Sequence, residues 1–550
     1  MSRRFLLLAL FSQISGKDLS VKSSYDILLN SKDRIHATPH VTNLIRNGAS
    51  ELTESEKSRL IKIGLSVQGN KIVVVKPTDL DQIYDTDHFR FFYTLDGSDA
   101  VENEYYVISM GEIFEEVWTF HIDTMGFDPP PTDPSTNHGL YEVYIEYLGS
   151  GYFGWANGVG AGPSCFSYIK MQNSYSAAAF SEHTEVENIQ VTAVHEFFHA
   201  VQFGYNCYER FWFMEATAVW SEDELYNDVN DLYRYMTSWF SNPDKAIDSE
   251  TNHMYGSFIY FQYIDEHLGG RETIRTCWEK SREYSTSSQD ISFTAIDAAL
   301  EEQNSSFVDA YNRVRIANQI MSSHQNAEPY TYQEANGYLT VVNRPNTKKE
   351  LYYEKGYVDT ESDLTLTLYA SHYYSLETNS PVILTLIPDS GPLSELSFST
   401  ITKLSGTNDW FVQMGTEVNI DPAIGMDWVS IIVSAIGDEG NNWDYTIRLE
   451  DGYSEDYTIF SPYPNPTMGV STNIDLQVIS EQTINIRIID VLGRVIWNYA
   501  EYFSEPQIMS INWNGKNLNG KNAANGVYFI ITEGKAKTTV HKITLLKKSD

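Results

Sequence analysis

The sequence contains few cysteines and few basic residues for its 550 positions. Its three cysteines, Cys165, Cys207 and Cys277, allow one disulfide at most, which excludes a scaffold held together by disulfides. Lysine and arginine number 38 against 74 aspartates and glutamates, and the net charge of −36 repels phosphate backbones and anionic lipid surfaces. Nucleic acid is therefore not an expected partner. The many carboxylates are compatible with Ca²⁺, although no sequence pattern indicates a calcium site.

Long apolar runs are also missing. No segment approaches the roughly 18 consecutive apolar residues of a membrane-spanning helix, so the mature chain is predicted to have no transmembrane segment. Residues 1–16 combine Arg3 and Arg4 with a short apolar run from Phe5 to Phe11, a pattern typical of a secretory signal peptide. The mature protein is therefore predicted to be secreted, either into the medium or onto the outer cell surface.

Residues 17–85 are mixed in composition and contain one clear helix signal. Thr53 and Glu56 form a capping box, and Gly64 stands where the helix would end. This stretch lies between the signal peptide and the next predicted domain, so it is either a propeptide or an accessory N-terminal segment. The sequence leaves both interpretations open.

Residues 86–335 mix strand and helix patterns. Phe89–Tyr93, Tyr141–Ile145 and Ser167–Met171 read as strands. Between Val107 and Met125, apolar residues recur at steps of three and four, which predicts an amphipathic helix. An α+β domain is the expected result.

A glycine-rich segment runs from Gly149 to Gly162, between the last two predicted strands. Its beginning formally matches a dinucleotide-binding fingerprint, but further glycines and Pro163 exclude the helix that such a site needs. The segment is therefore predicted to be a loop. Cys165 and Cys207 flank the third strand and the helix that follows it, so a bridge between them is geometrically plausible, while Cys277 would stay unpaired.

Beyond residue 335 the helical patterns give way to alternating runs such as Val382–Leu386 and Trp428–Val433. Frequent turn residues separate these runs, which is typical of antiparallel sandwiches. Residues 336–455 are predicted to form one β-sandwich and residues 456–550 a second. The predicted fold class is a multidomain chain in which an α+β domain precedes two all-β, immunoglobulin-like sandwiches.

The chemistry is concentrated in an HExxH motif, formed by His195, Glu196 and His199. Upstream, Thr184 and Glu187 form a capping box that predicts the start of a helix. On a helix, the two histidines at i and i+4 project from one face about one turn apart, close enough to share one zinc ion.

A third ligand is expected downstream at Glu215, a carboxylate within an apolar, alanine-containing helical segment. Burying such a carboxylate is costly unless it is paired or binds a metal. Two histidines and one glutamate would leave a fourth zinc position open for water. The metzincin pattern is excluded because Gln202 and Tyr205 stand where that family has glycine and histidine.

The region from His88 to Glu215 resembles the zincin peptidases that use glutamate as third ligand, and in particular secreted metalloproteases of myxobacteria. The resemblance implies a zincin-like catalytic domain over residues 86–335, one Zn²⁺ bound by His195, His199 and Glu215, and Glu196 as general base. One position departs from the thermolysin-like pattern: Val219 replaces the aspartate that orients a histidine there, so the partners of the ligands stay unassigned.

The predicted function is a secreted zinc endopeptidase that acts on protein or peptide substrates. The alternative is a cell-surface adhesion or binding protein with a degenerate, non-catalytic zincin domain. For the oxyanion donor the order of motifs favours Tyr255, with His253 as second choice, although an ordinary packing role suits Tyr255 equally well.

The last segment resembles the type IX secretion sorting domain of Bacteroidota. The resemblance rests on an ordered set of short motifs over about 90 residues: Tyr463-Pro464-Asn465-Pro466, Ile486–Val495, Trp513–Asn517 and Asn525–Phe529. It implies a second partner besides the substrate, namely the type IX secretion machinery.

Overall fold

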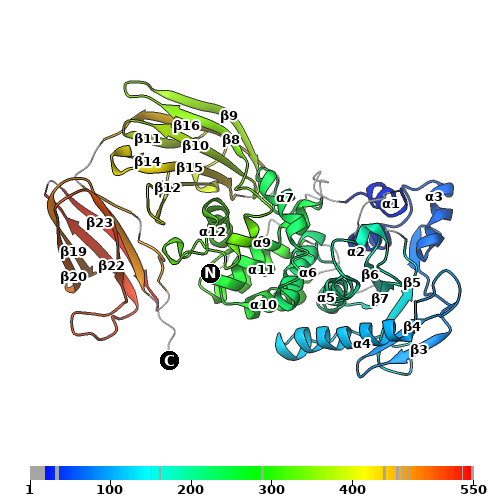
Figure 1. Cartoon of the computed structure of the whole chain (residues 1–550). Helices are drawn as coiled ribbons and strands as arrows, with labels where there is room; N and C mark the ends of the chain where they lie inside the picture. Colours follow the sequence, from blue (N-terminus) through cyan, green and yellow to red (C-terminus); the bar gives the residue numbers. More distant parts are fainter. Residues whose placement is uncertain are drawn as a thin grey trace, which may run out of the picture. The chain divides into compact units, whose positions relative to one another are not determined.

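The computed structural model describes residues 19–30, 36–149, 151–159, 163–285, 290–437, 441–453, 457–460, 462–467, 471–535 and 537–546 (Figure 1). The predicted signal peptide, residues 1–16, lies outside the described residues. The chain divides into two compact units, Met1–Trp239 with Ile247–Ala310 and Phe240–Ala246 with Tyr311–Asp550. The first unit is α+β and the second is mostly β, so the chain is a multidomain protein whose C-terminal half consists of sandwich-like sheets.

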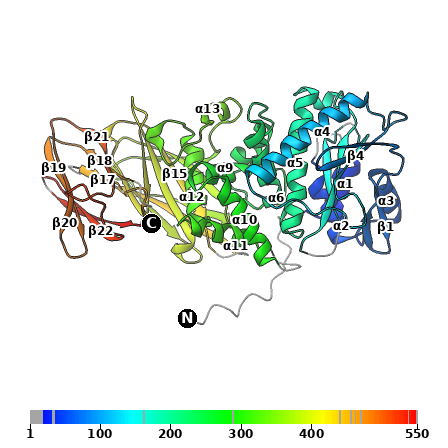
Figure 2. The same ribbon diagram turned by 90° about the horizontal axis from the view of Figure 1, so that it is seen from below.

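A five-stranded sheet in the order β3-β4-β5-β7-β6 supports the first unit. Strands β4, β5 and β7 run parallel, whereas β6 lies antiparallel to β7 at one edge. Two long helices pack against this sheet and against each other, as the two views show (Figures 1 and 2). The elements are β3 (Gln82–Asp85), β4 (Phe89–Tyr93), β5 (Tyr141–Glu146), β6 (Gly154–Val159), β7 (Phe166–Gln172), α4 (Glu104–Trp118) and α5 (Glu185–Tyr205). The three predicted strands and the amphipathic helix are confirmed.

Strand β6 corrects the prediction of a loop between Gly149 and Gly162. One face of β6 carries only Gly154, Ala156 and Gly158, and it lies against α5. A Cβ at Gly154 would meet Thr192 Cγ2 at 2.9 Å, and one at Gly158 would meet the Phe203 ring at 3.3 Å. The glycines therefore permit close packing of a strand on a helix instead of marking a loop.

A layer of helices completes the first unit. Helix α6 crosses α5, and α8, α9 and α10 continue from α6. Their cores are strongly aromatic; for example, the rings of Phe213 and Trp278 stack at 4.3 Å. The elements are α6 (Phe211–Tyr226), α7 (Tyr233–Ser241), α8 (His253–Gly256), α9 (Phe258–His267), α10 (Arg271–Tyr284) and α11 (Ser292–Glu302). Most of α12 (Phe307–Ile320) belongs to the second unit.

The N-terminal segment contains more helix than predicted. The expected capping box of Thr53 and Glu56 starts α3 (Glu54–Arg59), and Gly64 ends the following turn with φ 76°. Two further helices, α1 (Val21–Asn30) and α2 (Thr38–Asn47), precede it, and the hairpin β1 (Leu65–Gln68) and β2 (Lys71–Val74) follows. Helix α2 is rich in β-branched and polar residues, so its propensity is poor and burial stabilises it instead.

Each sandwich of the second unit has its own apolar core. In the first, sheets β13-β12-β15-β10-β8 and β14-β11-β16-β9 face each other, and β8 with β10 is a parallel exception among antiparallel pairs. In the second, the sheets are β17-β18-β21 and β20-β19-β22-β23. The short helix α13 (Ala335–Tyr338) precedes strands β8 (Thr347–Tyr353), β9 (Asp359–Thr367), β10 (Ser371–Thr378), β11 (Val382–Pro388), β12 (Leu396–Leu404), β13 (Trp410–Met414), β14 (Glu417–Ile420), β15 (Met426–Ala435), β16 (Asn442–Asp451), β17 (Tyr457–Ile459), β18 (Thr472–Val478), β19 (Gln482–Asp490), β20 (Val495–Phe503), β21 (Gln507–Trp513), β22 (Gly526–Glu533) and β23 (Thr538–Leu545).

The cysteines behave as expected. Cys165 and Cys207 form a disulfide, and Cys277 is a free, buried thiol. In the part of the chain that the structure describes, no helix combines the length and apolar content needed to cross a membrane.

A substitution at Trp513 tests the assignment of the apolar core in the C-terminal sandwich. Trp513 is fully buried, and its indole N–H donates to the Lys516 carbonyl at 2.9 Å. We expect Trp513→Ala to lower the free energy of unfolding of this sandwich by about 3–5 kcal/mol, because it removes a large buried side chain. Urea unfolding of the full chain measures this loss. The control Leu492→Ala, at a residue that is 75% exposed, should change it by less than about 0.5 kcal/mol. An unchanged transition for Trp513→Ala would contradict the assignment of this core.

Candidate functional site

Helix α5 positions both histidines of the HExxH motif. Its first turn is fixed as predicted: the Thr184 hydroxyl accepts from the Glu187 N–H, and the Glu187 carboxylate accepts from the Thr184 N–H. One face of the helix then carries His195 and His199 a single turn apart, and both are buried. Helix α6 packs across α5 and brings the buried Glu215 to the same place.

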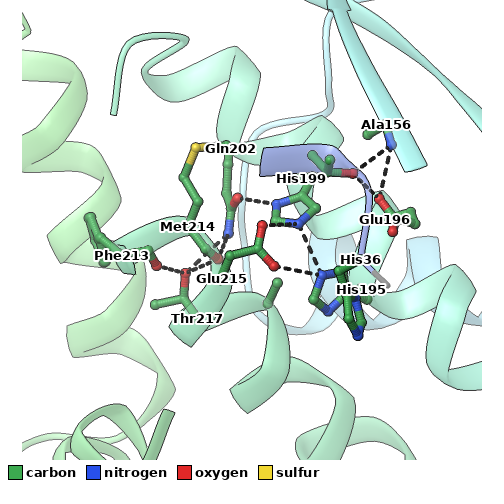
Figure 3. A network of polar contacts seen from close by, with 12 residues as sticks. His36, Ala156, His195, Glu196, His199, Gln202, Phe213, Met214, Glu215 and Thr217 are labelled. Carbon is green, nitrogen blue, oxygen red and sulfur yellow. Dashed lines mark hydrogen bonds and ion pairs between the residues drawn. The ribbon is translucent and has the colours of Figure 1, made fainter. Parts of the chain in front are cut away.

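The three side chains meet in one cluster, which Figure 3 shows from close by. The two Nε2 atoms of His195 and His199 lie 3.0 Å apart. Glu215 places Oε2 3.2 Å from His195 Nε2 and Oε1 3.1 Å from His199 Nε2. The ligand atoms all lie within 4.8 Å of one another, so the structure brings together the three residues that the sequence singled out as metal ligands.

Hydrogen bonds on the far side of each imidazole decide where its proton is. His195 Nδ1 lies 2.6 Å from Glu222 Oε1, and a carboxylate accepts only, so Nδ1 carries the proton. His199 Nδ1 lies 2.7 Å from Gln202 Oε1. The amide of Gln202 is oriented because its Nε2 donates to Met214 O at 2.9 Å and to Thr217 Oγ1 at 3.1 Å. Both Nε2 atoms therefore point lone pairs into the cluster.

In its neutral form each ring therefore directs an Nε2 lone pair at the Glu215 carboxylate. These groups repel one another unless positive charge lies among them, either as a proton on Nε2 or as a bound cation. Nitrogen donors favour a transition metal such as zinc over Ca²⁺ or Mg²⁺, which prefer oxygen ligands. The donor set therefore fits one zinc ion held by His195, His199 and Glu215.

The charges of the cluster also favour a bound cation. Burial alone would raise the pKa of Glu215, but the two imidazoles outweigh burial and hold this pKa well below its ordinary range. Burial alone would lower the pKa of His195, but Glu215 and Glu222 outweigh it and raise this pKa well above its ordinary value. The carboxylates thus attract positive charge to the site.

Glu196 lies beside the cluster and is held by two donors. Its Oε2 accepts from the Thr38 hydroxyl at 2.7 Å and from the Ala156 N–H of the edge strand β6 at 2.9 Å. The carboxylate is buried and follows directly on a ligand in the sequence. It is therefore placed where a base for a water molecule in the cluster would be needed.

Tyr255 and His253 lie on α8. The ring of Tyr255 is 5.2 Å from that of His36, whose ring lies 4.4 Å from that of His195. Burial and the charges of Glu215 and Glu196 raise the pKa of Tyr255 well above its ordinary value, so its phenol keeps the proton. His253 instead stacks on Trp239 at 4.9 Å, with Nδ1 3.2 Å from the Ser238 carbonyl.

The sequence did not indicate four neighbours of the site: His36, Thr38, Gln202 and Glu222. Two of them carried a usable signal, since Gln202 is one turn beyond His199 and Glu222 is two turns beyond Glu215. The other two, His36 and Thr38, lie in the N-terminal segment, and their approach depends on tertiary packing alone.

Two family models match parts of the chain. Residues 461–546 match the secretion system C-terminal sorting domain, which confirms the type IX sorting domain and with it a secreted or cell-surface protein that engages the type IX secretion machinery. Residues 96–313 match a family of unknown function, DUF6055. This span contains the histidine and glutamate cluster, but the family carries no described activity.

No curated protein matches the chain. Similar solved structures include PorZ of Porphyromonas gingivalis (19% identity, TM-score 0.13, covering 16% of this chain and 11% of PorZ). They also include latent, dimeric PorU of the same organism (15% identity, TM-score 0.18, covering 31% of this chain and 18% of PorU). A third is a β-glucuronidase of Parabacteroides merdae (8% identity, TM-score 0.16, covering 32% of this chain and 28% of the enzyme). The chain thus spans less than a third of each of these proteins, and the likeness is too low to indicate a shared fold.

Glu222 offers a test of the proton placement. We expect Glu222→Gln to weaken zinc affinity by about 10- to 100-fold, because the neutral amide lacks the negative charge that makes the His195 ring a stronger ligand, and its NH2 group can also turn toward Nδ1. Competition against a chromogenic chelator measures the affinity. Glu224→Gln, two residues along α6 and paired with Arg271, is the matched control and should leave it unchanged. Equal affinity of Glu222→Gln and the parent chain would refute the role assigned to Glu222.

Proposed function

We propose that this chain is a secreted zinc endopeptidase whose first unit is a zincin-like catalytic domain. The observation that carries the proposal is the convergence of the His195, His199 and Glu215 lone pairs, with the Glu196 carboxylate beside them. Three protein ligands leave one zinc position open, which is the arrangement of catalytic rather than structural zinc sites.

The position of each side chain indicates its role in the proposed reaction. Zinc, when bound, would supply a Lewis acid that polarises the scissile carbonyl and acidifies a water molecule. The Ala156 N–H fixes Oε2 of Glu196, so Oε1 is the atom that takes the proton of the attacking water. Glu196 then passes this proton to the amine that leaves, which completes hydrolysis of the peptide bond.

Tyr255 is the proposed donor to the oxyanion. Its phenol is buried and protonated, and it lies on the helix next to the cluster. A phenolic donor near the open zinc position would stabilise the negative charge that develops on the carbonyl oxygen.

The rival function, an adhesion protein with a non-catalytic zincin-like domain, predicts the same fold but no turnover. The presence of all three ligands, the base and both proton-fixing partners favours the enzyme, because a degenerate site has no need of Glu196 or of the Ala156 N–H that orients it. Zinc content and peptide hydrolysis measured on the same preparation separate the two functions.

Glu196→Gln tests the base. We expect the variant to retain zinc at the parent stoichiometry and to lose peptide hydrolysis, because an amide keeps the shape but cannot accept the water proton. Metal analysis and cleavage of a quenched fluorescent peptide measure the two properties. Glu185→Gln, at an exposed position on the same helix, is the control and should behave like the parent. Near-normal turnover of Glu196→Gln would exclude Glu196 as the base.

Tyr255→Phe tests the donor. We expect kcat to fall by about a hundredfold with little change in KM, because the hydroxyl acts mainly in the transition state. Tyr260→Phe is the matched control: its buried hydroxyl bonds to the Phe307 carbonyl and plays no part in the proposed site. Unchanged kinetics for Tyr255→Phe would leave Tyr255 with a packing role and make His253 the next candidate.

A further inference from the structure

Helix α2 lies between strand β6 and the beginning of helix α6, the two elements that flank the proposed site. On one side it packs against the edge strand β6. On the other, the Arg46 guanidinium donates to Glu209 O at 2.9 Å and to Cys207 O at 2.8 Å, and lies over the Phe211 ring at 4.6 Å. The helix therefore fills the space between β6 and the beginning of α6.

Residues at the N-terminal end of α2 contact side chains of the proposed site. His36 lies beside His195 and Tyr255, and its Nε2 pairs with the Tyr235 hydroxyl. His36, His195 and Glu196 offer ligand atoms that all lie within 4.8 Å of one another. Thr38 donates to Glu196 Oε2 at 2.7 Å and accepts from the Ala156 N–H at 2.9 Å.

A peptide substrate needs the same groups. It must approach the proposed metal site and pair with exposed backbone groups of an edge strand. Strand β6 is such an edge strand, and α2 packs against it. Residues 36–38 thus occupy positions that a bound substrate requires.

We propose that the segment around α1 and α2 is an autoinhibitory cover, in which His36 and Thr38 block the site until the segment is displaced. The inference rests on the proposed peptidase function, because only an enzyme of that kind needs the cover removed. It favours the propeptide-like interpretation for the part of residues 17–85 around α1 and α2, whereas β3 at the end of that range is a strand of the five-stranded sheet.

Buried polar groups without partners, on β6 and on α2, favour displacement of the cover. Alternation along β6 places Asn157 on the same face as Trp155, which packs into the core formed with α1 and α2. The side chain of Asn157 is buried, and neither its Oδ1 nor its Nδ2 has a partner among the described residues. The Thr42 hydroxyl of α2 is buried in the same unsatisfied way. Unpaired buried groups cost free energy, and displacement of the cover would return them to water or to a substrate.

The test uses the full chain loaded with zinc. We expect Thr38→Ala to raise peptide hydrolysis by about tenfold or more, the factor that its lost hydrogen bond to the Glu196 carboxylate represents, and His36→Ala to raise hydrolysis because it removes the ring that lies beside His195. Both should also speed the transfer of zinc to a chelator. Thr42→Ala, which removes an unpaired hydroxyl from the same helix, is the matched control, and Thr38→Ser should restore the parent behaviour.

The possible results distinguish the autoinhibitory cover from the proposed peptidase function. Faster zinc transfer without hydrolysis in any variant would support the cover and refute the peptidase. Zinc transfer at the parent rate, or lower hydrolysis with zinc retained, would overturn the cover and make Thr38 a residue that positions Glu196.

If the substitutions prevent folding, a recognition sequence for a specific protease can be inserted at the exposed Glu51. Cleavage there should raise hydrolysis and zinc transfer once residues 19–47 dissociate. Unchanged values after their dissociation would overturn the cover.

Discussion

The proposed site depends on where two protons lie. Glu222 and Gln202 hold the proton of each imidazole on Nδ1, and this leaves both Nε2 lone pairs directed at Glu215. The need to place Glu222 and Gln202 beside the two imidazoles explains the packing of α5 against α6. Helix α6 must present Glu215 and, two turns later, Glu222 to the same neighbour, while its Met214 carbonyl orients Gln202. Small residues such as Ala216 and Ala218, both fully buried, allow α6 to be enclosed on all sides.

Local signals in the sequence were sufficient for the helix that carries the histidines. The capping box at Thr184, the i, i+4 spacing and the strand alternation all act within a few residues, and the structure has the corresponding elements. Glu215 was identified from the free-energy cost of burying a carboxylate, and the structure places it in contact with both histidines. The proton-fixing partners were not identified, because a hydrogen bond between two helices depends on how the helices pack.

The failures of prediction have the same physical origin. Helix α2 has a composition that favours other conformations, and it forms because seven of its ten residues are buried by the rest of the unit. The glycines of strand β6 predict a loop from the sequence alone, because the helix that lies against them is not visible in the local pattern. In both cases tertiary contacts override local propensity, and both elements border the proposed site. Errors of this kind are expected where function constrains the sequence more than folding does.

The disulfide between Cys165 and Cys207 encloses β7 and the whole of α5, so both histidines lie inside a covalent loop that spans 42 residues. Closing a loop of this length contributes about 4 kcal/mol by restricting the unfolded chain. The contribution exists only where thiols are oxidised, which excludes the reducing cytosol in which the chain is made. The helix that carries the proposed zinc ligands therefore reaches its full stability only after export, and the chain inside the producing cell is both covered by its N-terminal segment and less firmly folded at the site.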